Sequence, residues 1–187
     1  MVELSSLLLP VLTAALFVFL VSFVAHMVLP YHRTDFGKIP SEDGVLDALR
    51  KFNIPEGDYV FPHAGSPEAM KNPDYAEKCK KGPIGFLTVM KPGAPTMGTS
   101  LVQWFLYCVL VGLFAAYVAG QALPPGAMYL SVFCIAGTTA FAGYGLALIQ
   151  NSIWYKRKWS TTLKSVLDAV VYSLVTGGTF GWLWPGA

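Results

Sequence analysis

Two side chains that could carry proton or ligand chemistry lie inside long apolar stretches of this chain, Asp168 and His26. A carboxylate within a membrane-spanning segment is costly, so such a residue is a functional candidate by default. Lys164 lies one helical turn before Asp168, where the two could pair, and Tyr172 and Thr176 continue a polar stripe on the same face. The stripe predicts either a proton or solute path, or hydrogen bonds that hold a helix bundle together. We favour the second, because Asp168 lies close to the end of its stretch.

His26 lies near the end of the first apolar stretch, and with His32 and His63 it could belong to a metal or haem ligand set. Haem in a helix bundle usually takes axial ligands from facing helices, and the later apolar stretches contain no histidine. We therefore expect a neutral His26 that makes a hydrogen bond near the membrane interface. The sequence predicts no metal site and no cofactor, although a haem site between two protomers stays open.

No catalytic motif is present in the sequence. It contains no HExxH, no phosphate-binding loop, no nucleotide-binding glycine fingerprint and no nucleophile elbow. The three cysteines form no CxxC pair that would indicate a zinc site. We therefore name no catalytic residue, and the sequence favours a protein that is not an enzyme.

The charged residues are confined to short parts of the chain. All thirteen Lys and Arg residues lie at 33–91 or 156–164, and residues 92–155 contain no Asp, Glu, Lys or Arg. The composition is 54% hydrophobic and 13% charged, about half the usual charged fraction of ~25%. This pattern indicates a multi-pass membrane protein. Acidic residues interrupt the basic ones, so we expect no nucleic-acid partner.

Four apolar stretches are long enough to cross a bilayer, which requires about 20 residues of helix. We place the first within residues 1–31 and the others at about 99–121, 127–151 and 166–184. The Pro124-Pro125 pair separates the second from the third. The predicted fold is an all-α membrane protein, a four-helix bundle of transmembrane helices. A small mixed cytoplasmic segment, residues 32–98, precedes the part that contains helices two to four, residues 99–187.

The basic residues also predict the orientation of the chain. Lys and Arg are enriched in cytoplasmic loops, and here they occupy only the segment after the first stretch and the loop after the third. We therefore expect segment 32–98 in the cytoplasm and both termini on the outer side of the inner (plasma) membrane.

Segment 32–98 is too varied in sequence for a simple connector. Cap-like residues at Ser41, Ser66 and Asn72 predict three short helices. Residues 59–61 and 84–90 are apolar and predict either short strands or pieces that lie on the membrane surface. So small a segment cannot bury a large core. We expect it to pack against the inner ends of the helices or against a partner.

Small residues recur at every fourth position within two of the predicted spans. Such stripes allow close approach of helix backbones and promote helix association in lipid. We favour packing inside one bundle, with docking of a partner or a homo-oligomer as the alternative. The residues are Gly112, Ala116 and Gly120 in the second span, and Ser173, Gly177 and Gly181 in the fourth.

Several segments resemble a group of uncharacterised bacterial multi-pass membrane proteins. The resemblance lies in residues 100–107, 136–144 and 179–185, together with the His26-Met27-Val28-Leu29-Pro30 exit from the first span. It implies a bacterial inner-membrane protein and no particular activity.

Three functional hypotheses remain on the sequence alone. The leading one is a non-enzymatic accessory or scaffolding subunit of a membrane assembly, with the lipid bilayer and a protein partner or second copy as its contacts. The second is a small oligomeric transporter or channel that uses the Asp168 stripe. The third is a redox or haem-binding membrane subunit that uses His26.

Overall fold

The computed structural model describes residues 1–94 and 96–186. The chain forms two compact units. We call residues 1–36 and 96–186 the bundle unit, and residues 37–94 the inserted unit. The bundle unit is mostly helical.

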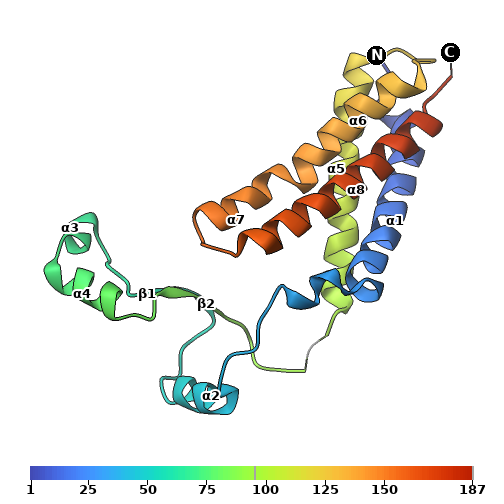
Figure 1. Cartoon of the computed structure of the whole chain (residues 1–187). Helices are drawn as coiled ribbons and strands as arrows, with labels where there is room; N and C mark the ends of the chain where they lie inside the picture. The colour runs from blue at the N-terminus through green and yellow to red at the C-terminus, as the bar shows by residue number, and fades with distance from the viewer. Residues whose placement is uncertain (95, 187) are drawn as a thin grey trace. The chain divides into compact units, whose positions relative to one another are not determined.

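The bundle unit consists of four long helices with short irregular turns at their ends (Figure 1). The first, α1, is preceded by a 3-10 turn and followed by a π-helical turn, η2, and a 3-10 turn, η3. The elements are α1 (Leu8–Phe23), η2 (Val24–Val28), η3 (Pro30–Thr34), α5 (Gly98–Ala122), α6 (Tyr129–Tyr144), α7 (Ile149–Ile153) and α8 (Trp159–Trp182).

Three helical segments are long and apolar enough to cross a membrane: Leu4–Val28, Gly98–Ala122 and Tyr129–Ile153. They match the first three predicted spans. Their outward faces carry leucine and phenylalanine, for example Leu9, Leu106 and Phe114, each more than half exposed. A water-soluble protein rarely exposes so much contiguous apolar surface, so these faces are suited to lipid.

The fourth predicted span differs from the observed helix. The sequence predicts a start near residue 166, whereas α8 begins at Trp159 and has the length of a membrane span. It is not among the three apolar segments, because it carries Lys164, Asp168 and several hydroxyl residues. The helix therefore begins several residues before the predicted span, which was placed on the apolar part of the sequence alone.

The helices pack in pairs, with α1 against α5 and α8, and α6 against α5 and α8. A Cβ atom at Gly112 would lie 3.2 Å from Val11 of α1, and one at Gly177 would lie 2.7 Å from the Phe133 carbonyl oxygen of α6. Both small-residue stripes thus face neighbouring helices of the same chain. Ala116 is buried with the first stripe and Ser173 with the second, while Gly120 contacts the N-terminal backbone and Gly181 contacts Tyr129.

The N-terminus and the C-terminal end of α8 lie at the same end of the bundle (Figure 1). Backbone hydrogen bonds close this terminal end. The Val2 amide donates to the Gly120 carbonyl at 2.8 Å, and the Gly126 amide donates to the Pro185 carbonyl at 2.8 Å. The indole of Trp184 donates to the Pro124 carbonyl at 3.0 Å. The opposite end, where Lys164 lies, is called the basic end below.

The inserted unit contains three short helices and one antiparallel strand pair. The helices are α2 (Glu42–Arg50), α3 (Pro67–Met70) and α4 (Pro73–Lys81); the strands are β1 (Gly57–Phe61) and β2 (Gly85–Val89). Tyr59 pairs with Leu87 at the centre of the sheet, and Val60 pairs with Phe86 beside it. The Ser66 and Asn72 side chains accept the predicted capping hydrogen bonds, but Ser41 adopts a left-handed conformation and caps nothing. The two apolar pieces are therefore strands that pair with each other.

Candidate functional site

A group of five polar side chains lies at the basic end of the bundle, between the end of α1 and the first turns of α8. We call it the polar cluster; it comprises Tyr31, His32, Asp35, Lys164 and Asp168. Three of its members come from the short segment after α1, and two come from α8.

The turn after α1 positions the first three residues. The helix widens into the π-helical turn η2, and Leu29 then adopts an extended conformation with φ −78° and ψ 139°. Leu29 precedes Pro30, and a residue before proline disfavours the helical conformation. Pro30 starts the 3-10 turn η3, which brings Tyr31 and His32 alongside α8.

Asp168 is buried, and it receives its hydrogen bonds from the segment after α1. The Tyr31 hydroxyl donates to one carboxylate oxygen, and His32 Nε2 lies 2.9 Å from the other. A carboxylate removed from water requires such partners, because burial of an unpaired charge is very unfavourable. The sequence identified Asp168 as a candidate but gave no indication of these two partners.

Lys164 pairs with Asp35 and not with Asp168, contrary to the expectation from their helical spacing. Its Nζ donates to Asp35 Oδ1 at 2.9 Å and to Thr34 Oγ1 at 2.9 Å. It also donates to the Tyr31 carbonyl. The second Asp35 oxygen lies 2.6 Å from His32 Nδ1. Lys164 and Asp168 therefore both bind the segment after α1, where each finds an opposite charge or a donor.

The electrostatics of Asp35 follow from these contacts. Burial alone would raise its pKa, but the hydrogen bonds from His32 and Lys164 outweigh burial and lower the pKa of this carboxyl below its usual value. Asp35 is therefore ionised at neutral pH. It balances the charge of Lys164 and orients the His32 ring.

His26 lies in η2, next to the cluster. Its ring stacks on that of His32, with centroids 4.3 Å apart and planes 9° from parallel. Its Nδ1 lies 3.1 Å from the Ser22 carbonyl oxygen, which is a hydrogen bond of the predicted kind. A π-helical turn within an α-helix is rare and is frequent at functional sites.

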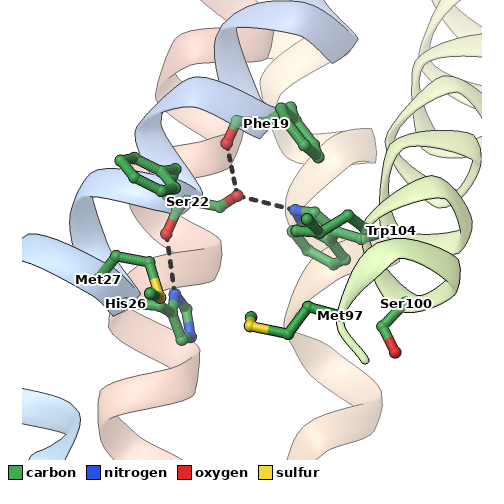
Figure 2. A pocket seen from close by; sticks show the side chains of 9 residues that line it. Phe19, Ser22, His26, Met27, Met97, Ser100 and Trp104 are labelled. Carbon is green, nitrogen blue, oxygen red and sulfur yellow. Dashed lines mark hydrogen bonds between the residues drawn. The ribbon is translucent and has the colours of Figure 1, made fainter. Parts of the chain in front are cut away.

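A cavity of about 390 Å³ adjoins His26 between α1 and α5. Figure 2 shows its walls, with the Trp104 indole donating to the Ser22 hydroxyl at 2.8 Å across the upper part. The lining is mainly apolar and consists of Phe19, Ser22, Phe23, His26, Met27, Met97, Ser100, Leu101 and Trp104.

In the polar stripe that continues from Asp168, the Thr176 hydroxyl makes its hydrogen bond within its own helix. The Thr176 hydroxyl donates to the Tyr172 carbonyl at 2.8 Å, within its own helix. The Tyr172 hydroxyl is buried without a hydrogen-bond partner, and its ring packs between Trp104 and Tyr144 at centroid distances of 5.8 and 5.6 Å. These contacts position rings and helix faces, and they do not form a continuous hydrogen-bonded chain.

Sequence reasoning missed Tyr31 and Asp35 as members of the site, and it named His32 only as a possible metal or haem ligand beside His26. The usable signal was the i, i+3 spacing of His32 and Asp35 directly after an apolar helix, since polar residues at that place often bind the ends of neighbouring helices. His63 belongs to the inserted unit. No protein-family model, curated protein or solved structure matches this chain.

Proposed function

We propose that this chain is a non-enzymatic accessory subunit of a bacterial inner-membrane assembly, and that its inserted unit binds a partner protein. The bundle anchors the subunit, and the inserted unit carries the binding surface in the cytoplasm. The observation that carries this proposal is the lack of a core in the inserted unit. None of residues 37–94 is buried.

Large apolar side chains of the inserted unit are exposed to an unusual degree. The exposed fractions are 73% for Phe52, 61% for Met70, 65% for Ile84 and 78% for Met90. A segment that buries so little apolar area gains little free energy to offset the entropy lost on ordering. Exposed apolar side chains in such numbers are typical of surfaces that bind another molecule. A partner protein would supply the missing contact area.

In the proposed topology α8 also crosses the membrane, as a fourth span. Three observations support it: α8 has the length of a span, it packs along α6, and its two charged residues lie in its first three turns, paired at the basic end. Both chain ends lie at the other end, which holds no Lys or Arg. By the positive-inside rule the basic end is then cytoplasmic.

A transport role for the Asp168 stripe is less well supported. Tyr31 and His32 cover the Asp168 carboxylate, and the threonine hydroxyls beyond it bind their own helix backbone. A solute path would require polar groups that face a common opening. The geometry instead favours a structural role, in which the stripe fixes α8 against its neighbours.

Site-specific photo-crosslinking in intact cells tests the proposal. A photoreactive amino acid at position 52 or 84 should crosslink to one protein, and the same probe at the exposed, polar position 47 of α2 serves as the matched control. Crosslinks from 52 and 84 to a second polypeptide, absent from 47, are the expected result. A product at twice the mass of the chain would identify a second copy as the partner. Crosslinks only within the chain's own bundle would contradict the proposal.

A further inference from the structure

Three side chains with metal-binding atoms converge at the basic end of the bundle, from three different elements. The available atoms of His26 in η2, His32 in η3 and Asp168 in α8 all lie within 4.8 Å of one another. The two histidines are separated from Asp168 by more than a hundred residues of sequence, so the fold itself creates the group.

The contacts of His32 are not satisfied by a neutral imidazole. Its Nδ1 faces the Asp35 carboxylate at 2.6 Å, and its Nε2 faces the Asp168 carboxylate at 2.9 Å. A neutral imidazole donates through one nitrogen only, so one carboxylate would face a lone pair. A cation between Nε2 and Asp168 removes this conflict. The cation is either the proton of an imidazolium or a bound metal ion.

The surrounding groups resemble the outer shell of a metal site. Metal-binding histidines usually donate their second ring N–H to a carboxylate or a backbone carbonyl, which fixes the ring and its tautomer. Asp35 occupies that position for His32, and the Ser22 carbonyl occupies it for His26 at 3.1 Å. With Nδ1 of each ring so engaged, both Nε2 lone pairs are left for a ligand.

We propose that His26, His32 and Asp168 bind a divalent transition-metal ion at the basic end of the bundle. Two imidazoles and one carboxylate suit ions such as Zn²⁺, Co²⁺ or Fe²⁺ and disfavour Mg²⁺ and Ca²⁺, which prefer oxygen ligands. Three protein ligands leave at least one coordination position for water or another molecule. The site requires nothing of the inserted unit, so it is independent of the function proposed above.

The present arrangement has to adjust slightly around an ion. Ligand atoms bound at about 2.0–2.2 Å lie roughly 3.4 Å from one another in a tetrahedral site. The 2.9 Å between His32 Nε2 and Asp168 Oδ2 has to widen toward that value, whereas the ligand atom of His26 lies within 4.8 Å of the other two and has to approach them. His26 is the ligand that moves most, because it is exposed and its ring is held by the stack on His32 and one hydrogen bond. Rotation of its side chain would replace the stack with a bond from Nε2 to the ion.

Cobalt binding to the full chain tests the site. The protein is purified in mild detergent without a polyhistidine tag, treated with a chelator, and titrated with Co²⁺ while the visible ligand-field absorption is recorded. Zn²⁺ is then added as a competitor, and bound metal per chain is counted by mass spectrometry. We expect one Co²⁺ per chain, displaced by Zn²⁺, with an affinity at least ~10-fold lower for His26→Ala and Asp168→Asn, the loss that even outer-shell substitutions cause.

His26→Ala is the decisive variant, because a protonated His32 would make the same contacts with Asp35 and Asp168 without any help from His26. The substitution removes an exposed side chain, so the bundle should remain folded, which circular dichroism and gel filtration verify. His63→Ala in the inserted unit is the matched control and should bind Co²⁺ as the unaltered chain does. The proposal is overturned if the unaltered chain shows no ligand-field bands up to millimolar Co²⁺, or if His26→Ala leaves the titration unchanged.

Discussion

Lys164 and Asp168 lie one turn apart on α8, yet the side chain of each contacts the segment that follows α1 and not the other. Such cross-element contacts connect two parts of the bundle that lie far apart in sequence. An i, i+4 pair on one helix contributes only about 0.2–0.5 kcal/mol and fixes no tertiary contact. The observed pairing instead attaches the chain after α1 to α8, and it makes the stability of the basic end depend on single side chains.

Replacement of Lys164 by Met should therefore destabilise the bundle. The substitution retains the length of the side chain but leaves the Asp35 carboxylate, whose side chain is 8% exposed, with His32 as its remaining donor. We expect a loss of about 2–3 kcal/mol, below the 3–5 kcal/mol of a fully buried pair because Lys164 is partly exposed. Thermal unfolding in detergent measures the loss. Lys158→Met, at the exposed start of α8, is the control, and equal melting temperatures for the two variants would refute the argument.

The residues of this site were only partly predictable from the sequence. Asp168, Lys164 and His26 stand out because they are ionisable groups near apolar stretches. Their partners do not, because Tyr31 and Asp35 are ordinary residues of a hydrophilic stretch until the fold places them beside α8. Local spacing suggested a Lys164–Asp168 pair, and tertiary contacts of more favourable geometry replaced it.

At the scale of elements, the close contact of α6 with α8 depends on glycine. Gly177 of α8 lies against Phe133 and Gly137 of α6, where the backbones approach directly. In lipid no hydrophobic effect drives helices together, so close van der Waals packing of small residues supplies much of the association. The adjacent Gly178 faces open space except for the Tyr129 hydroxyl, 3.6 Å from its Cβ position.

Gly177→Ala and Gly178→Ala form a matched pair that tests this packing. A methyl group at 177 would lie 2.7 Å from the Phe133 carbonyl oxygen, so the helices must separate, at a cost of about 1–3 kcal/mol. At 178 the added methyl group would lie at an ordinary contact distance from its neighbour. The higher helix propensity of alanine should then raise the free energy of unfolding by up to about 1 kcal/mol. Unfolding curves of the two variants should therefore shift in opposite directions. A stabilising Gly177→Ala would show that this contact is not tight.

Helix existence was easier to predict than helix ends. Three predicted spans agree with Leu4–Val28, Gly98–Ala122 and Tyr129–Ile153 to within a few residues, because long apolar runs ended by Gly and Pro leave few alternatives. The helix α8 extends beyond the predicted fourth span at its start, because its first turns are polar and lie outside the apolar pattern from which the span was predicted. The π-helical turn at 24–28 lies within the first apolar run, whose pattern does not distinguish it from the α-helix before it.

At the scale of the whole molecule, the two units differ in the amount of surface that they bury. The bundle unit contains two clusters of buried apolar side chains. One includes Val11 and Ala115, and the other includes Val18 and Tyr172. In contrast, no residue in 37–94 is buried. Local stability follows such differences, since segments with few buried contacts open at low free-energy cost.

Hydrogen exchange on the purified chain should reveal this difference. Backbone amides of β1 and β2 in the inserted unit should exchange at least ~100-fold faster than those in the middle of α5, although both are hydrogen bonded. Mass spectrometry of peptides from the exchanged protein measures both in one sample. A partner that binds the inserted unit should slow exchange in β1 and β2 and leave α5 unchanged. If β1 and β2 exchange slowly in the isolated chain, the inserted unit has a buried core of its own, and the argument from its lack of buried residues is wrong.

The number of membrane crossings determines on which side the two ends of the chain lie. Three crossings by the apolar segments alone would leave Met1 and α8 on opposite faces, whereas a fourth crossing by α8 returns the chain to its first side. The terminal end supports the fourth crossing, because the Gly126 amide donates to the Pro185 carbonyl and Trp184 donates to the Pro124 carbonyl. Residues 124–126 and 184–185 must then lie on the same face of the membrane.

Cysteine labelling in spheroplasts tests this arrangement. In a background without native cysteines, Met128→Cys and Gly186→Cys should both react with a membrane-impermeant maleimide. Lys158→Cys, at the start of α8, should react only after the membrane is permeabilised, because the positive-inside rule places the basic end in the cytoplasm. If the maleimide labels Met128→Cys from outside the cell and Lys158→Cys only after permeabilisation, then α6 and α7 together form one membrane span. If Gly186→Cys is protected along with Lys158→Cys, α8 does not cross, and the polar contacts of Lys164 and Asp168 would then lie outside the lipid.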